Sequence, residues 1–173
     1  QGFSAALLLN LGATDDYEAM KMALSKASKL SHPVVLDPVG VSGIEFRRRF
    51  AYELLKQGGI SCRRGNYNEI KAIMENQTVA AGLDYDKNEA SKDLVESSID
   101  ALARRMKKYA GDNNIILAAS GEIDIVTDGS EVAYIESGDA MMSSVTGSGC
   151  MASAVVASML AHNNSMKSVV SAM

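Results

Sequence analysis

The stretch HPVVLDPVG, residues 32–40, decides the fold class of this 173-residue chain. At its centre is the continuous apolar run Val34–Leu36, and such a short run predicts a strand buried on both faces of a sheet. Pro33 ends any helix that precedes the strand, because the residue before a proline is disfavoured in the helical region. Asp37 follows directly, so the strand leads into a charged residue. A helix, a buried strand and a polar strand exit form the repeating unit of an α/β protein.

Periodic patterns on both sides of this stretch extend the same arrangement. Apolar residues spaced three and four apart predict amphipathic helices, and short apolar runs between turn residues predict strands. We expect helices over residues 15–30, 45–56, 66–75, 89–109 and 147–162, and another that begins after Ser165. We expect strands over residues 5–9, 34–36, 60–63, 115–119, 123–127 and 132–135, the last two forming a hairpin around Asp128-Gly129.

These elements predict one α/β domain, residues 1–173, with a mostly parallel central sheet, helices on both faces and a late antiparallel hairpin. The sequence has no internal repeat and no interdomain linker, and residues 78–87 are the expected exposed loop. The chain starts beside a predicted strand and stops inside a helix whose apolar face needs a partner. We therefore expect it to be truncated at both ends.

Composition and charge narrow the function classes. Hydrophobic residues make up 47% of the chain and charged residues 22%, as in an ordinary globular protein. A formal net charge of -4 gives no basic field that would attract nucleic acid or an anionic membrane. The most apolar stretch, residues 151–161, is shorter than the ~20 residues of a membrane-spanning helix. Two cysteines fit a reducing compartment, so we expect a cytoplasmic protein that acts on a small molecule.

Three predicted strands end in polar residues, namely Asp37, Arg64-Gly65-Asn66 and Ser120-Gly121-Glu122. Ligands of open α/β sheets bind at these carboxyl ends. Asp37 and Glu69 could hold Mg²⁺, which prefers one or two carboxylates with waters and phosphates. The structural alternatives are an Asp-Pro turn for Asp37 and a capping box with Asn66 for Glu69, and the second is favoured without further context.

Arg64 could clamp a phosphate through its planar guanidinium, and a surface ion pair is the alternative. The run Arg47–Arg49 lies within a predicted helix, where successive side chains point in different directions, so we expect a mostly solvated face. Cys62 lies in an apolar strand and is expected to be a core residue.

The strongest local signal is VTGSGC, residues 145–150, which precedes a helix of small residues. Glycines at a helix start leave backbone N–H groups uncovered, and with the helix dipole Gly147, Ser148 and Gly149 would form an anion hole. The stretch is not a Walker A loop, because it lacks the Gly-Lys-Ser/Thr ending. Cys150 in the first helical turn is a candidate base or nucleophile. An equally weighted alternative is a turn packed closely on the sheet, with Cys150 a small core residue.

Taken in order, five blocks of the sequence resemble the hydroxyethylthiazole kinase family of the ribokinase-like superfamily. The blocks are ALLLNLG (6–12), PVVLDPVG (33–40) with Phe46-Arg47, Arg64-Gly65-Asn66 with Glu69-Ile70, GEID (121–124) with TDG (127–129), and VTGSGC (145–150). The resemblance spans nearly the whole chain. It implies a ribokinase-like fold and a kinase that transfers the ATP γ-phosphoryl group to the hydroxyl of 4-methyl-5-(2-hydroxyethyl)thiazole in thiamine biosynthesis.

The resemblance also implies roles for individual residues. Arg64 and Ser120 match ATP contacts of the family, and Gly147 matches a substrate-binding glycine. Cys150 stands where most ribokinase-like kinases have a catalytic aspartate. A weak base can suffice there, because phosphoryl transfer has a loose transition state that depends mainly on positioning and charge neutralisation.

Mg²⁺ and a subunit partner are likewise implied by the resemblance. Asp37, and Glu69 in the superfamily's Asn-x-x-Glu form, would join the Mg²⁺ shell. Family members are homotrimers with active sites between subunits, so we expect the same assembly here, with ATP and a thiazole alcohol as small-molecule partners.

Some features depart from the family's pattern. Its Asn- and Thr-rich N-terminal segment, whose methionine touches the thiazole, and its C-terminal helices have no match in the sequence. Ser120 replaces a commoner Thr, and Cys62-Arg63 replaces an apolar approach to Arg64. The alternatives are a hydroxymethylpyrimidine-type kinase, an ATP-dependent nicotinamide-hydrate dehydratase (which usually has Asp in place of Cys150), a cysteine acyl transferase, and a non-catalytic nucleotide-binding fragment.

Overall fold

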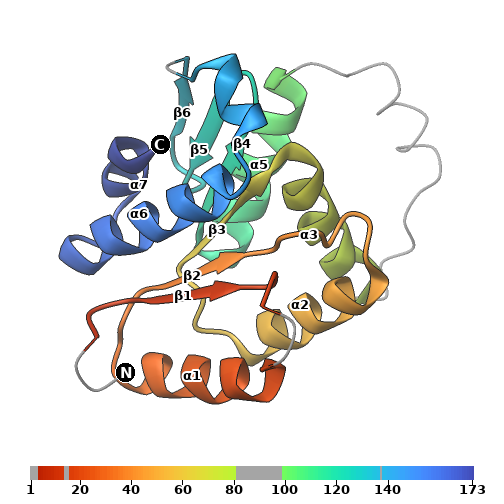
Figure 1. Ribbon diagram of the computed structural model, residues 1–173, viewed down its shortest axis with the longest axis vertical. Helices are drawn as coiled ribbons and strands as arrows, with labels where there is room; N and C mark the ends of the chain where they lie inside the picture. Colours follow the sequence, from red (N-terminus) through yellow and green to blue (C-terminus); the bar gives the residue numbers. More distant parts are fainter. Residues whose placement is uncertain (1–3, 14–15, 81–98, 137) are drawn as a thin grey trace.

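The computed structural model of the protein describes residues 4–13, 16–80, 99–136 and 138–173. A six-stranded sheet runs through them in the strand order β1-β2-β3-β4-β5-β6 (Figure 1). The strands are β1 (Leu7–Asn10), β2 (Val34–Asp37), β3 (Cys62–Asn66), β4 (Ile116–Ser120), β5 (Asp124–Thr127) and β6 (Val132–Ile135). Strands β1 to β4 pair in parallel, and β5 and β6 add an antiparallel hairpin. The mostly parallel sheet with a late hairpin is therefore confirmed.

Helices cover both faces of this sheet. They are α1 (Tyr17–Lys29), α2 (Glu45–Gln57), α3 (Tyr67–Ala80), α5 (Ile99–Asn113), α6 (Ser148–His162) and α7 (Met166–Ala172), with a 3-10 helix η1 (Ala140–Ser144) before α6. Parallel strands that follow one another in space and in sequence place their right-handed crossovers on one face. Helices α1, α2, α3 and α5 occupy that face, and α6 and α7 cover the other (Figure 1).

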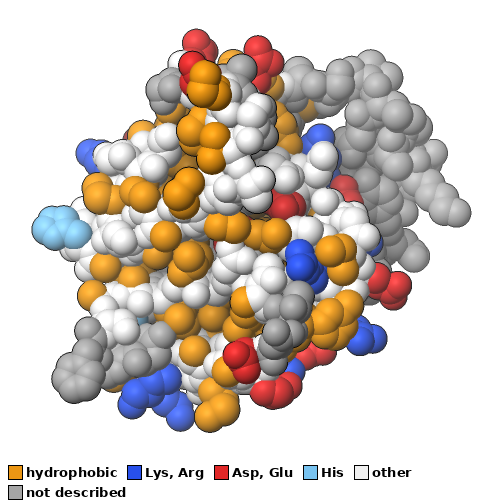
Figure 2. Space-filling model, in the orientation of Figure 1, with side chains coloured by type: hydrophobic (Ala, Val, Ile, Leu, Met, Phe, Trp, Pro, Cys, Tyr) orange, Lys and Arg blue, Asp and Glu red, His pale blue; other side chains and the backbone are white. Residues whose placement is uncertain are grey.

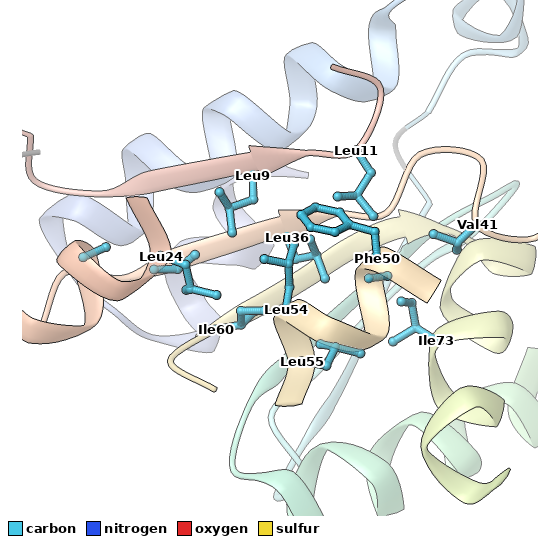
Figure 3. Close-up of a cluster of buried hydrophobic side chains, with 13 residues drawn as sticks. Leu9, Leu11, Leu24, Leu36, Val41, Phe50, Leu54, Leu55, Ile60 and Ile73 are labelled. Carbon is cyan, nitrogen blue, oxygen red and sulfur yellow. The ribbon is translucent and has the colours of Figure 1, made fainter. Parts of the chain in front are cut away.

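Strand β2 explains why both faces need a cover. All four of its residues are buried, as expected of a parallel strand between two helical layers. Leu36 points into a cluster under α1 and α2 that includes Leu24 and Phe50 (Figure 3). Val35 faces the opposite way and packs with Cys62 against α6. Cys62 has no exposed surface, so its prediction as a core residue is confirmed, and this burial raises the pKa of its thiol to about 12.

The predicted element boundaries differ from the observed ones mainly at two places. Strand β3 continues through Arg64 to Asn66 instead of ending at residue 63, because both arginines find partners elsewhere in the fold. Helix α3 continues to Ala80, so the loop predicted over 78–87 is wrong for its first three residues, and the others lie outside the described residues. Residues 89–98 of the long predicted helix also lie outside the described residues, and the part that is described starts at Ile99.

Local sequence signals account for two of the element ends. Ser165 caps α7, where its side chain accepts the N–H of Ser168, as a helix-capping serine does. The hairpin turn is held by Asp128, whose Oδ1 accepts the N–H groups of Ser130 and Glu131. None of the described helices is long and apolar enough to span a membrane.

Candidate active site

Polar side chains from four parallel strands meet at the carboxyl edge of the sheet. Asn10 pairs with Asp37 across β1 and β2, and Asn66 pairs with Ser120 across β3 and β4. Helix α6 begins over the same edge, because the carbonyl of Gly149 lies 2.7 Å from Nη1 of Arg64. The structure therefore brings the three predicted strand exits and the predicted anion hole together.

Asp37 is the most buried acid of the site, with 2% of its surface exposed. Its Oδ2 accepts a hydrogen bond of 3.1 Å from Nδ2 of Asn10. Burial raises the pKa of this carboxyl to about 6, opposed by the Ser153 hydroxyl and the Arg64 charge and reinforced by the Glu69 charge. Asp37 thus interacts electrostatically with Arg64 and Glu69. A local Asp-Pro turn alone does not account for these interactions.

Glu69 forms a capping box with Asn66, which the sequence predicts as the alternative to a role in Mg²⁺ binding. Asn66 Oδ1 accepts the N–H of Glu69, and Glu69 Oε2 accepts the N–H of Asn66, both at 2.9 Å. The other oxygen, Oε1, accepts the N–H of Gly40 at 2.9 Å. Glu69 therefore ties the loop after β2 to the start of α3, and we name Asn10, Asp37, Gly40, Asn66 and Glu69 the acidic corner.

Two of the three consecutive arginines of α2 support the same loop. Arg47 donates from Nη1 to the carbonyl of Val39, and Arg48 donates to the carbonyls of Val41 and Ser42. The prediction of a mostly solvated face is wrong for these two residues and fits Arg49, which is exposed.

Arg64 is buried in spite of its charge, with 7% of its surface exposed. A surface ion pair is therefore wrong as an account of this residue. Its Nη1 donates to the Gly149 carbonyl, and its Nε has no hydrogen-bond partner among the described residues. A Cβ at position 149 would lie 3.2 Å from Nη1, so glycine there lets the helix approach the guanidinium.

The glycine turn, residues 145–150, is exposed where it enters α6. Gly147 has φ +88° and a Cβ there would meet nothing within 4 Å. Cys150 is exposed, so the alternative of a closely packed turn with a core cysteine is wrong. The N–H of Ser148 donates to the Val145 carbonyl at 3.3 Å, so the prediction of a free anion-hole amide is wrong for Ser148. The N–H of Met151 donates to the carbonyl of Gly147, whereas the N–H groups of Gly149 and Cys150 have no backbone acceptor in the part of the chain that is described. Such free amides at a helix start are the elements of an anion site.

Ser120 lies beside a turn that is braced from α3. Its Oγ donates to the Gly65 carbonyl at 3.4 Å. Gly121 packs on the ring of Tyr67, which a Cβ would overlap, and the Tyr67 hydroxyl donates to the Ile123 carbonyl. Asp124 Oδ1 accepts the N–H of Gly121. Tyr67 was not predicted as a residue of the site from the sequence. The available signal was its position directly after Asn66, at a predicted strand exit.

Exposed apolar side chains surround the glycine turn. Figure 2 shows hydrophobic groups across the face that η1 and α6 present, and the exposed ones are Met141, Met142, Val145, Met151 and Val155. A pocket of about 710 Å³ lies instead at the opposite edge of the sheet, where His32, Ser61 and Ser165 line it. The candidate site is thus an open surface, on which a ligand would find polar groups beside apolar ones.

The acidic corner fits a Mg²⁺ ion that is held mainly by substrate. Within the described ranges, no group of three or more His, Cys, Asp or Glu side chains could enclose a metal. Mg²⁺ in phosphoryl-transfer sites needs only one or two carboxylates, because waters and substrate phosphates supply its other ligands. Asp37 and Glu69 are the two carboxylates available here.

Comparison with known proteins identifies the family. The family model described as "Hydroxyethylthiazole kinase family" matches residues 2–173. The chain belongs to this family. It is 36% identical over 159 residues to a hydroxyethylthiazole kinase of Clostridium acetobutylicum and 34% identical over 173 residues to one of Methanococcus vannielii. These alignments cover 91% and 97% of the chain but only 57% and 60% of the two relatives.

Solved structures agree with the family in fold. The hydroxyethylthiazole kinase of Pyrococcus horikoshii superposes with a TM-score of 0.80 at 27% identity, covering 99% of the chain and 60% of that protein. The pyridoxal kinase of Bacillus subtilis superposes with a TM-score of 0.63 at 20% identity, covering 97% of the chain and 61% of that protein. The second likeness concerns the fold alone, and together they confirm the predicted ribokinase-like architecture of this family member.

Proposed function

We propose that the protein transfers the γ-phosphoryl group of ATP to the hydroxyl of 4-methyl-5-(2-hydroxyethyl)thiazole, a step of thiamine biosynthesis. The observation that carries the proposal is the 2.7 Å contact between Arg64 and Gly149. It joins a buried cation to the free amides that start α6, while Asp37 and Glu69 lie on the same edge. Cation, amides and carboxylates are the parts that a phosphoryl-transfer site needs.

Arg64 and Ser120 are the residues proposed to bind ATP. The guanidinium has Nη1 on the Gly149 carbonyl, and its planar fork carries further N–H donors of the kind that bind a phosphate. Ser120 ends β4 beside the Gly65 carbonyl. The turn after it is fixed by Tyr67, which supports a defined position for the nucleotide.

The glycine turn is proposed to bind the acceptor alcohol and the migrating phosphoryl group. Gly147 would contact the substrate, and the free amides of Gly149 and Cys150, with that of Gly147, would face the charge that develops on the phosphate. Cys150, exposed in the first turn of α6, would accept the alcohol proton. The demands on this base are small, because positioning and charge neutralisation dominate the reaction.

Asp37 and Glu69 are the proposed Mg²⁺ residues. When bound, the ion would neutralise the negative charge of the ATP phosphates. The chain's own contribution is to hold the two carboxylates in place, through Asn10 on one side and through the N–H groups of Gly40 and Asn66 on the other.

We infer further that the protein works in the cytoplasm as a homotrimer with active sites between subunits. The family resemblance supports this assembly. The exposed methionines and valines around the glycine turn support it as well, since apolar patches beside a site are suited to a neighbouring subunit or to an apolar ring.

A coupled assay of ADP release on the native, full-length protein tests the activity. We expect release that depends on both Mg²⁺ and the thiazole alcohol, and a product that gains one phosphate by mass spectrometry. Turnover of a hydroxymethylpyrimidine or of nicotinamide hydrate in place of the thiazole would contradict the proposal, as would nucleotide binding without transfer.

A further inference from the structure

Asn10 ends β1 directly opposite Asp37 on β2, and the two side chains are hydrogen-bonded. The strand register makes this pairing, because Asn10 and Asp37 are Cα partners at the carboxyl ends of neighbouring parallel strands. Backbone bonds anchor both sides of the pair, since the N–H of Leu11 donates to the Asp37 carbonyl and the N–H of Ala13 donates to the Asn10 carbonyl.

The orientation of the Asn10 amide is fixed by a second contact. The N–H of Gly12 donates to Asn10 Oδ1 at 2.7 Å, so the oxygen end of the amide is occupied by a donor. The NH₂ end must then face Asp37 Oδ2, 3.1 Å away. The reverse orientation would place a donor against the Gly12 N–H and an acceptor against the carboxylate.

Gly12 permits this arrangement because it has no side chain. A Cβ at position 12 would lie 2.8 Å from Asn10 Oδ1, closer than real Cβ contacts, and the end of the Asn10 side chain would have to move. The backbone of Gly12 itself can accept alanine, since its φ is not in the left-handed region. Position 12 therefore offers a way to displace the amide while leaving both Asn10 and Asp37 in the chain.

We propose that Asn10 is a positioning residue that presents the Asp37 carboxylate to the metal–nucleotide complex. The inference rests on the proposed function. Asp37 is almost fully buried, and a buried carboxylate needs donors to hold it in one orientation. Asn10 supplies such a donor from β1, on one side of β2, whereas Arg64 lies on β3, on the other side. Partners of this kind orient metal ligands in other proteins, and their loss costs about 10–100-fold in metal affinity or activity.

The test compares two variants with two matched controls. Asn10→Leu removes the donor at nearly constant size, and Gly12→Ala displaces it. Asn113→Leu removes an exposed asparagine whose amide donates to a backbone carbonyl in α5, and Gly43→Ala adds a Cβ that meets nothing within 4 Å. Mn²⁺ binding in the presence of ADP, followed by electron paramagnetic resonance, measures the effect without requiring transfer.

We expect Asn10→Leu to weaken Mn²⁺ binding about 10–100-fold and Gly12→Ala to weaken it in the same direction by less, with both controls equal to wild type. In the kinase assay, the Mg²⁺ concentration for half-maximal rate should rise, and saturating Mg²⁺ should restore most of kcat for Gly12→Ala. Urea unfolding separates these effects from a loss of stability. If Asn10→Leu does not fold, Gly12→Ala decides the question.

Equal Mn²⁺ affinity for wild type, Asn10→Leu and Gly12→Ala would overturn the positioning role, and so would a wild type that binds no Mn²⁺ with ADP. A wild type that binds Mn²⁺ but does not phosphorylate the thiazole would refute the proposed function alone. In that case the weaker metal binding of the two variants would still support the role of Asn10.

Discussion

The acidic corner and the glycine turn meet at one edge of the sheet but are built in opposite ways. In the corner, Asp37 is 2% exposed. Its side chain bonds to that of Asn10, and the Glu69 carboxylate accepts the backbone N–H groups of Gly40 and Asn66. In the glycine turn, Gly147 and Cys150 are exposed, and space is open around Gly147. Rigid charged groups thus stand beside a segment with room for a substrate, and Arg64 joins the two through the Gly149 carbonyl.

This difference assigns different energetic roles to the two regions. The corner holds its charges in place before any ligand arrives, which costs stability because a buried carboxylate is poorly solvated. The turn carries free amides, which cost little while water can reach them. We therefore expect substitutions in the corner to change stability and its pH dependence in addition to metal binding, and substitutions in the turn to act mainly on catalysis.

The largest expected effect lies in the corner. Burial raises the pKa of Asp37 from 3.8 to about 6, so the folded state binds this proton more tightly than the unfolded state. Stability then falls as pH rises from about 4 to about 6 and levels off above. Asp37→Asn abolishes the titration, and its free energy of unfolding relative to wild type should rise by about 2–3 kcal/mol between pH 4 and pH 7.

Urea unfolding at the two pH values checks this. Asp112→Asn, on the exposed end of α5, is the matched control and should show no such rise. If the difference between Asp37→Asn and wild type is the same at both pH values, Asp37 is not destabilised by burial. The acidic corner would then not differ from the glycine turn in its cost to stability.

Gly147→Ala is expected to have an intermediate effect, on activity. Its φ of +88° lies in the left-handed region, which costs a residue with a Cβ about 1–2 kcal/mol. The strain should rotate the amides that follow and lower kcat/KM about tenfold. Gly43→Ala also meets nothing within 4 Å and has no positive φ, so it isolates backbone strain from added bulk. Equal activity of the two variants would show that the conformation of the turn does not matter.

Cys150→Asp should have the smallest effect and retain or improve turnover. A carboxylate is favourable in the first turn of a helix, and a carboxyl group of ordinary pKa is ionised at neutral pH and thus available to accept the alcohol proton. Parallel kcat measurements on this variant and on Gly147→Ala give the ordering. Collapse of turnover in Cys150→Asp together with full activity of Gly147→Ala would reverse the assignment of catalysis to the amides.

Hydrophobic patterning was sufficient to predict most of the fold. The run Val34–Leu36 is buried on both faces, and the hairpin strand 132–135 has the predicted bounds. Strand β3 was harder to predict, because it contains Arg63 and Arg64. Arg63 lies 5.2 Å from the ring centre of Tyr109 and donates to its hydroxyl. This partner is 46 residues away in sequence, and local patterns carry no information on such contacts.

The site was predictable to the extent that strand ends could be placed. Asp37, Arg64 and the start of α6 share one edge as expected, because parallel strands end together. Asn10 and Tyr67 were missed, since their importance depends on strand register and on contacts across the turn after β4. For Asn10, the signal would have been the strand register that places it opposite Asp37.

Helix α6 is late in the sequence, yet it covers Val35 of β2 and Cys62 of β3. While the chain emerges from the ribosome, these early strands can acquire the helices of the first layer one after another, since each lies beside its neighbours in sequence. Their second face stays uncovered until Val156 and Leu160 have been synthesised. A nascent chain of this protein therefore carries bare strand surface for much of its translation, a stage at which chaperone binding would have its greatest effect.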